Sequence, residues 1–332
     1  MPAMNLGAAR LVRLRLPLPL VLRQINVYLI QGPDAVALVD TGMALPTDHD
    51  RPGHQALVQQ LARVGCTPQQ ISQLFITHLH ADHFGQAAWL QRMGCQIIMS
   101  RGDSQALQYW FQHPEFDGAS LDFFRELGAP VDSLADVARS MASMRQISPA
   151  FVPDREVDDG ESIELAGESF EVLVTPGHSP AHACLHHRPT RTLLVGDHVL
   201  PYITPNISVT SHIGADNPLD DYRRSLVHLR GAGFATALPA HGPPIADIDR
   251  RIDEILLHHD QREALVLSLV EQPTSCYALS EALFQISRLD GWETLMAVGE
   301  TLAHLRSLVA RSRVKQVQRD GVILFTSSGG PS

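Results

Sequence analysis

Hydrophobic positions divide the first part of the chain into short strands and helices that alternate. Two β-branched, apolar runs within residues 25–42 flank a Gly-Pro-Asp turn at 32–34, a pattern typical of a β-hairpin. Residues 54–65 have apolar side chains at helical spacing and end on a glycine, and residues 71–78 then read as a buried strand. This alternation predicts sheets covered by helices, an α/β fold.

The pattern becomes more helical further along the chain. Residues 101–150 contain three amphipathic stretches separated by Gly and Pro, which predicts a helical insertion before strands return. After residue 245 we expect three helices and then a hairpin around the Arg-Asp-Gly turn at 319–321, the order of a winged-helix module. We therefore predict a main domain over 1–245, a separate helical, winged-helix-like domain over 246–326 and a flexible tail over 327–332.

Charge and cysteine usage narrow the class of protein. The chain has 26 basic and 36 acidic residues, a formal net charge of −10, which argues against bulk electrostatic binding to nucleic acid or an anionic membrane. Its four cysteines form no C-x-x-C pair, which favours a reducing cytoplasm. Arginines and prolines interrupt the apolar opening of 22 residues, so we predict an edge strand there instead of a signal peptide. No apolar stretch reaches the ~20 residues that a bilayer span needs.

Histidine is the unusual residue, with 17 copies, and the segment "FITHLHADHFG" at 75–85 holds three of them beside an aspartate. Imidazole and carboxylate together suit Zn²⁺, Fe or Mn²⁺ and disfavour Ca²⁺. A single His-x-His is better explained as a surface loop or as a cluster satisfied by hydrogen bonds in the core. Further ligand-type residues follow other predicted strands: His178 in "TPGHS", Asp197 in "VGDHV" and His241 in "PAHGPP". Strand ends on one rim of a sheet converge, so we expect these side chains to meet.

This ordered set resembles the metal motifs of the metallo-β-lactamase superfamily over roughly residues 10–245, and Asp40 in "VDTG" matches a further position of that family. The resemblance, to the glyoxalase II-like branch with a C-terminal winged-helix-like domain, implies a four-layer αβ/βα sandwich with a two-metal site at its edge. True β-lactamases commonly have a cysteine where Asp197 stands, so antibiotic hydrolysis is not expected. The resemblance implies that the first metal binds His78, His80 and His178, the second binds Asp82, His83 and His241, and Asp197 bridges both.

Two divalent ions about 3.5 to 4 Å apart lower the pKa of a shared water and generate a bridging hydroxide at neutral pH. Zn²⁺ is the expected metal, with Mn or Fe as alternatives. Asp82 and Asp197 are the predicted catalytic residues, with Asp82 orienting the hydroxide or passing a proton to the leaving group. Asp40 and His182 are expected to support the ligands from behind. Possible substrate contacts are His198, Tyr202 and His212, whereas His258 and His259 are assigned to the surface of a helix.

The leading interpretation is a hydrolase of an ester, thioester or lactone of a small metabolite, such as acyl-CoA or another acyl thioester. Aromatic residues in the insertion suit an apolar substrate, although core packing explains such residues equally well. One alternative is a metal-dependent endoribonuclease or phosphodiesterase, motivated by basic residues near the C-terminus; another is an iron-dependent oxidoreductase of the sulfur dioxygenase kind. The net charge makes nucleic acid the less favoured partner, and a homodimer is possible. The residues concerned are Tyr109, Trp110, Phe111, Phe116, Phe123 and Phe124 in the insertion, and Arg306, Arg311, Arg313, Lys315 and Arg319 near the C-terminus.

Overall fold

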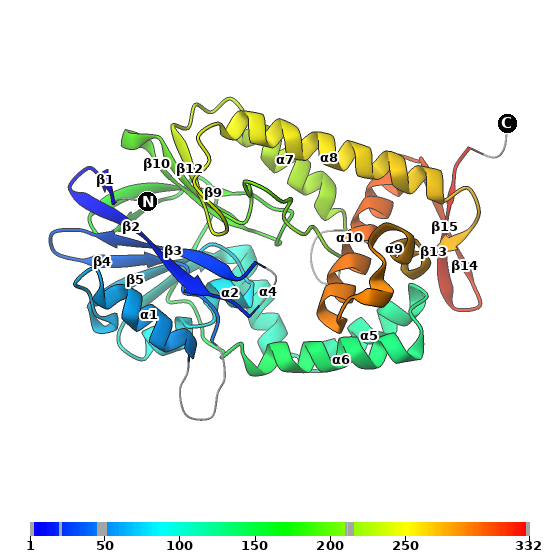
Figure 1. Ribbon diagram of the computed structural model, residues 1–332, viewed down its shortest axis with the longest axis horizontal. Helices are drawn as coiled ribbons and strands as arrows, with labels where there is room; N and C mark the ends of the chain where they lie inside the picture. Colours follow the sequence, from blue (N-terminus) through cyan, green and yellow to red (C-terminus); the bar gives the residue numbers. More distant parts are fainter. Residues whose placement is uncertain (1–2, 20–21, 45–51, 210, 212–215, 330–332) are drawn as a thin grey trace.

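Two β-sheets lie face to face, and helices cover the outer surface of each, in the computed structural model of residues 3–19, 22–44, 52–209, 211 and 216–329 (Figure 1). The first sheet has seven strands in the order β1 to β7, and the second has five in the order β12-β11-β10-β9-β8. This is the four-layer αβ/βα sandwich that the sequence predicted.

The first sheet contains the predicted hairpin, which is confirmed as its third and fourth strands, β3 and β4. β3 is buried at six consecutive positions, 25–30, because both faces of the sheet are covered there. The predicted N-terminal edge strand is divided: β1 forms the edge, and β2 pairs with both β1 and β3 and ends at a proline. The strands are β1 (Met4–Leu6), β2 (Ala9–Pro17), β3 (Gln24–Gln31), β4 (Val36–Val39), β5 (Ile71–Ile76), β6 (Gln96–Ser100) and β7 (Arg155–Val157).

The second sheet packs its inner face against the first. Large apolar side chains such as Phe75 and Ile30 of the first sheet meet Phe170 and Leu194 of the second in a core between the sheets. Within each sheet the strands that precede the predicted ligands run parallel, β4 beside β5 and β11 beside β12. The strands are β8 (Ser162–Leu165), β9 (Glu168–Val174), β10 (Ala183–His187), β11 (Thr192–Gly196) and β12 (Thr236–Pro239).

Helices form the two outer layers. Apolar side chains of α1 (Pro52–Ala62), α2 (Ala81–Phe84), α3 (Ala87–Gln91) and α4 (Arg101–Gln112) pack on the first sheet. Those of α7 (Pro218–Leu229) and α8 (Ile248–Leu269) pack on the second. Short 3₁₀ turns, η1 (Pro68–Gln70), η2 (Arg188–Thr190) and η3 (Ile286–Arg288), connect other elements. None of the helices among the described residues has the length and apolar content that crossing a membrane requires.

The insertion and the C-terminal segment contain the helices that the pattern predicted. The insertion comprises α4, α5 (Phe116–Glu126) and α6 (Val131–Gln146). The C-terminal segment adds α9 (Cys276–Phe284) and α10 (Gly291–Ala310) to α8, and the predicted hairpin is confirmed as β14 (Val314–Arg319) and β15 (Val322–Ser327). A short strand that the pattern did not indicate, β13 (Thr274–Ser275), pairs with β15. β15 occupies the start of the predicted tail, and residues 330–332 lie outside the described part of the chain.

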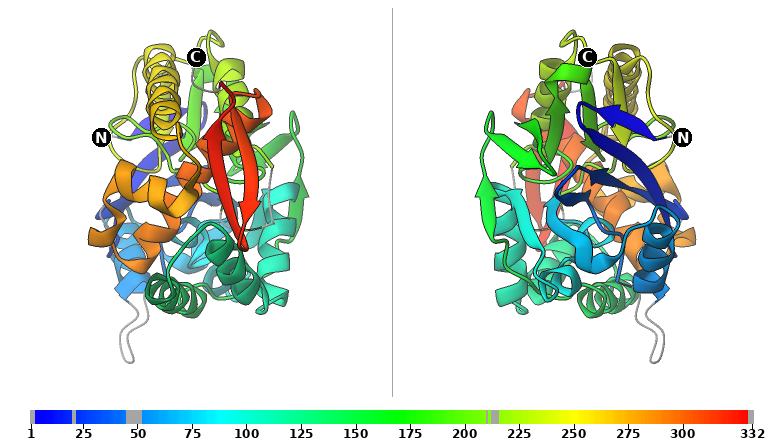
Figure 2. Two further views of the ribbon diagram at one scale, coloured as in Figure 1. Left: turned by 90° about the vertical axis from the view of Figure 1, so that its right-hand side faces the viewer. Right: turned by 90° about the vertical axis from the view of Figure 1, so that its left-hand side faces the viewer.

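The apolar side chains of the C-terminal segment share one cluster with the sandwich. One continuous apolar cluster joins Phe124 of α5, Leu193 of β11, Leu302 of α10 and Phe325 of β15. The N-terminal strands and the β14–β15 hairpin lie at opposite ends of the molecule, which Figure 2 shows in turn, and α10 lies between them (Figure 1). The segment after residue 245, which we predict to be a separate domain, therefore packs closely against the sandwich.

Candidate metal centre

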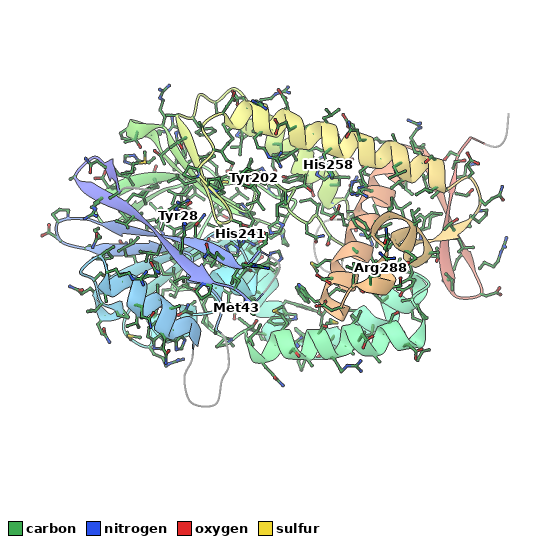
Figure 3. All side chains as sticks on the ribbon, in the orientation of Figure 1. Tyr28, Met43, Tyr202, His241, His258 and Arg288 are labelled. Atoms are coloured by element: carbon green, nitrogen blue, oxygen red, sulfur yellow. The ribbon has the colours of Figure 1, made fainter. Side chains whose placement is uncertain are left out.

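The predicted ligands lie where strands end. Asp40 and His78 follow the carboxyl ends of the parallel neighbours β4 and β5, and Asp197 and His241 follow those of β11 and β12. His178 lies in the turn after β9. The two sheets therefore present these side chains at one rim of the sandwich. Figure 3 labels His241 on the side of the sheets that faces α10.

One group of imidazoles has its nitrogens close together. His78 Nε2 lies 2.9 Å from His80 Nδ1 and 3.2 Å from His178 Nε2. Burial and neighbouring histidines hold the pKa of His78 well below its ordinary value and lower that of His80 to about 3. Neutral rings have a lone pair to offer, so these three nitrogens form a donor set for a metal ion.

A second group lies beside the first. Asp82 Oδ2 is 3.6 Å from His83 Nε2 and 3.4 Å from His241 Nε2. Asp197 Oδ2 lies between the groups, 3.6 Å from His83 Nε2 and 3.7 Å from His178 Nε2. Both groups thus have Asp197 within reach, the position of a bridging ligand.

Among the described residues, three buried polar atoms here have no hydrogen-bond partner: His83 Nε2 and His241 Nε2 of the second group, and Asp197 Oδ1 beside them. Buried polar atoms are normally paired, so their convergence points to a bound group. Although burial opposes a charge on His83, the carboxylates of Asp40, Asp82 and Asp197 raise the pKa of His83 well above its ordinary value. The negative charge of these carboxylates, which favours a proton on His83, would also stabilise a bound cation. Imidazole and carboxylate together are a suitable donor set for a divalent transition metal.

Hydrogen bonds on the outer ring nitrogens determine which nitrogen faces the site. Asp40 accepts from His83 Nδ1 at 2.8 Å and from the backbone N–H of Thr77 at 2.9 Å. The carboxylate only accepts, so the Thr77 hydroxyl donates to it, and His78 Nδ1, 3.0 Å from that hydroxyl, is then the donor. Asp40 thereby makes Nε2 the nitrogen of both rings that faces the site and that is free to bind a metal when the ring is neutral. Backbone carbonyls accept from His178 Nδ1 and His241 Nδ1 in the same way, at 2.7 and 2.9 Å.

Comparison with known proteins agrees with this geometry. Residues 20–241 match the model of the metallo-beta-lactamase superfamily, and residues 263–328 match that of the metallo-beta-lactamase-like C-terminal domain. The chain belongs to the metallo-beta-lactamase superfamily. Its family and its cluster of histidines and aspartates make it a metallo-hydrolase of this superfamily.

Relatives of this superfamily member match it over nearly its whole length. It is 27% identical over 325 residues to the probable metallo-hydrolase YqjP of Bacillus subtilis, covering 95% of this chain and 97% of that one. A metallo-beta-lactamase family protein from Thermus thermophilus has a TM-score of 0.85 at 31% identity, covering 96% and 98%. A beta-lactamase domain protein from Burkholderia ambifaria has a TM-score of 0.82 at 26% identity, covering 98% and 94%.

His182 lies directly behind the ligands. Its Nε2 accepts the backbone N–H of Asp197 at 3.2 Å, so Nδ1 is the donor to the Thr175 hydroxyl at 2.9 Å. Gly196 has φ +49°, and a Cβ there would lie 2.5 Å from His182 Nε2. Glycine is therefore needed for β11 to turn against this ring and place Asp197.

Of the three predicted substrate contacts, the two that the structure describes, His198 and Tyr202, are not brought to the candidate ligands. His198 is fully buried, packs between His182 and Tyr222, and does not line the adjoining cavity. Tyr202 is 79% exposed and lies outside the cavity lining, and His212 lies outside the described residues. The surface assignment of His259 was wrong, because this ring is buried against His304 of α10.

Asp103, in the first turn of α4, is a buried carboxylate that sequence reasoning missed. It accepts the backbone N–H groups of Leu79 at 3.0 Å and Ala181 at 2.6 Å, and the hydroxyl of Ser179 at 2.6 Å. It therefore joins the loop that carries His78 and His80 to the loop that carries His178. Acidic residues are common in the first turn of a helix, so the position of Asp103 in the sequence does not indicate that it connects these two loops.

A cavity of about 490 Å³ opens directly onto both ligand groups. The described residues that line it include no lysine or arginine. Of the predicted aromatic residues, Trp110 and Phe116 line it, whereas Phe123 and Phe124 belong to the core. Its apolar wall includes Met43 and Phe84 from the sandwich, Trp110, Phe116, Met141 and Met144 from the insertion, and Trp292, Leu295 and Met296 from α10.

Proposed function

We propose that this protein is a dinuclear metal-dependent hydrolase that cleaves the ester, thioester or lactone bond of an apolar acyl compound. The observation that carries the proposal is that both ligand groups face one cavity whose other walls are mainly apolar. Such a cavity would bind an acyl chain or ring by removing its apolar surface from water. The scissile carbonyl would then lie at the ligand groups.

The charge of the cavity supports an uncharged reacting group. A phosphodiester is anionic and is usually held by Arg or Lys, which are absent from the described lining residues. In the basic cluster that motivated a nuclease, Arg311 pairs with Asp220 and Glu263, and Arg306 donates to the carbonyl of Asp216. Both arginines therefore bind other residues of the same chain. A carboxylic ester, thioester or lactone is the better match.

His78, His80 and His178 would hold one ion, Asp82, His83 and His241 the other, and Asp197 would bind both. Two divalent ions held there would supply hydroxide at neutral pH and polarise the substrate carbonyl. Asp82 faces the cavity, so its carboxylate can orient a water or pass a proton to the leaving group. Zinc fits the donor set, and the four buried, unpaired cysteines support a reducing, cytoplasmic location.

The test is a substrate panel with protein reconstituted separately with Zn²⁺, Mn²⁺ or Fe²⁺. Acyl-CoA thioesters from C4 to C12, γ- and δ-lactones, p-nitrophenyl esters, a phosphodiester and an RNA oligonucleotide would be compared. We expect metal-dependent cleavage of at least one acyl class, lost in Asp197→Ala and retained in Tyr202→Ala, a control in an exposed side chain beyond the cavity lining. Cleavage of the phosphate substrates alone would refute the proposal. So would oxygen consumption with Fe²⁺ without hydrolysis, or full activity in Asp197→Ala.

A further inference from the structure

The segment that follows Asp197 lies between the metal centre and α10. Asn206, in this segment, provides the backbone oxygen that accepts from His178 Nδ1 at 2.7 Å. That hydrogen bond keeps the proton on the outer nitrogen of His178 and directs Nε2 to the ligand group. The position of His178 therefore depends on the position of the Asn206 backbone.

The side chain of Asn206 is held by α10. Its Nδ2 donates to Glu300 Oε2 at 3.1 Å and to the carbonyl of Met296 at 3.3 Å, while its Oδ1 accepts from Ser208. Each polar atom of the amide thus has a partner, which gives the side chain one orientation. Glu300 is the only partner of Nδ2 that a substitution of α10 can remove, because the other is a backbone carbonyl.

The same segment also touches α10 at Gly299, between Met296 and Glu300. Val209 N–H donates to the carbonyl of Gly299 at 3.1 Å, and a Cβ at Gly299 would lie 2.8 Å from the Cβ of Ser208. Glycine is unfavourable inside a helix, so its presence in α10 is explained by this close approach. Residues 206–209 are consequently docked on α10 by side-chain and backbone contacts together.

We propose that Glu300 and Asn206 are positioning residues through which the C-terminal helix α10 sets the metal-binding geometry of His178. The inference rests on the proposed function only in taking His178 as a ligand of the first metal. It gives the C-terminal segment a role at the metal centre that is separate from its contribution to the cavity wall. The second group, Asp82, His83 and His241, has no such connection to α10 among the hydrogen bonds of the described residues.

The experiment measures metal binding at each site without substrate. Chelator competition with Zn²⁺ and absorption spectra with Co²⁺ would be recorded for Asn206→Ala, Glu300→Ala and Glu300→Gln. Glu263→Gln is the matched control, because Glu263 is also a buried carboxylate against α10 but bonds Ser307 and Arg311, remote from His178. Glu300→Gln keeps an acceptor oxygen for Asn206, so it tests whether the hydrogen bond, as opposed to the charge, is needed.

We expect Asn206→Ala and Glu300→Ala to weaken one of the two metal sites about 10-fold or more and to change its Co²⁺ spectrum. Glu300→Gln should recover most of that affinity, and Glu263→Gln should leave both sites unchanged. Wild-type affinity at both sites in Asn206→Ala and Glu300→Ala would overturn the inference, as would an equal weakening of both sites that Glu263→Gln reproduces. Metal binding is measured without substrate. Its result therefore does not depend on whether the protein has the proposed hydrolase activity.

Discussion

The role of Asp40 gives a prediction whose size follows from its contacts. Asp40→Asn keeps the shape of the side chain but leaves one acceptor oxygen and adds an NH₂ group. If that oxygen keeps the hydrogen bonds of Thr77, the NH₂ group faces His83 Nδ1, which lies 2.8 Å from Asp40 in the wild type. His83 must then carry its proton on Nε2, the nitrogen that faces the second metal group. The substitution therefore removes a ligand without removing a ligand residue.

The expected loss is the value of a hydrogen bond to a charged group, about 1.5–3 kcal/mol. At about 1.4 kcal/mol for each factor of ten, this corresponds to roughly a 10- to 100-fold weaker second metal. The first site should change less, because the Thr77 hydroxyl can still donate to the amide oxygen and accept from His78 Nδ1.

Metal stoichiometry and chelator competition for wild type, Asp40→Asn and Glu263→Gln would measure both affinities, with thermal unfolding of the metal-free proteins to compare stability. Glu263→Gln alters a buried carboxylate far from the ligands and should keep two metals. Retention of the second metal within threefold of wild type in Asp40→Asn would refute the tautomer argument. An equal loss of both metals would refute it as well.

Three further predictions follow from individual contacts. Gly196→Ala places a Cβ 2.5 Å from His182 Nε2, so metal binding and thermal stability should both fall. Gly94→Ala is the control: Gly94 also has a positive φ, but a Cβ there would have no atom within 4 Å, so this variant should lower stability alone. Burial raises the pKa of Asp103 from 3.8 to about 6, so ionising it costs the folded state up to about 3 kcal/mol as pH rises from 4 to 7. Asp103→Asn removes that cost, so the difference in free energy of unfolding between metal-free wild type and variant should be largest near pH 4 and shrink toward pH 7. Trp292→Ala should raise KM for the longest acyl substrates more than for the shortest, because it removes part of the apolar wall; an equal change for all lengths would contradict this.

The candidate ligands could be picked out from the sequence because each lies in a short motif shortly after a strand, and the structure brings their side chains together. Asp103 and Asn206 could not, since their partners are distant in the sequence and leave no periodic mark. His259 is a different case. The buried positions of α8 include 252, 255, 259, 263 and 266, a helical spacing that places His259 on the inner face. This spacing can be read from the sequence, but His259 is polar and was therefore assigned to the surface.

The C-terminal segment was predicted to be a separate domain because its order of helices and strands is that of a winged-helix module. The sequence did not indicate how closely it packs on the sandwich, where α10 belongs to the apolar cluster that includes β10 and β11. One arginine that suggested a nucleic-acid surface has partners on the neighbouring helices: Arg311 pairs with Asp220 of α7 and Glu263 of α8. These pairs lie at the C-terminal end of α10, whereas Trp292 and Met296, which reach the cavity, lie near its beginning. The charges near the C-terminus therefore have partners within the fold, and the part of α10 that lines the cavity contributes apolar side chains.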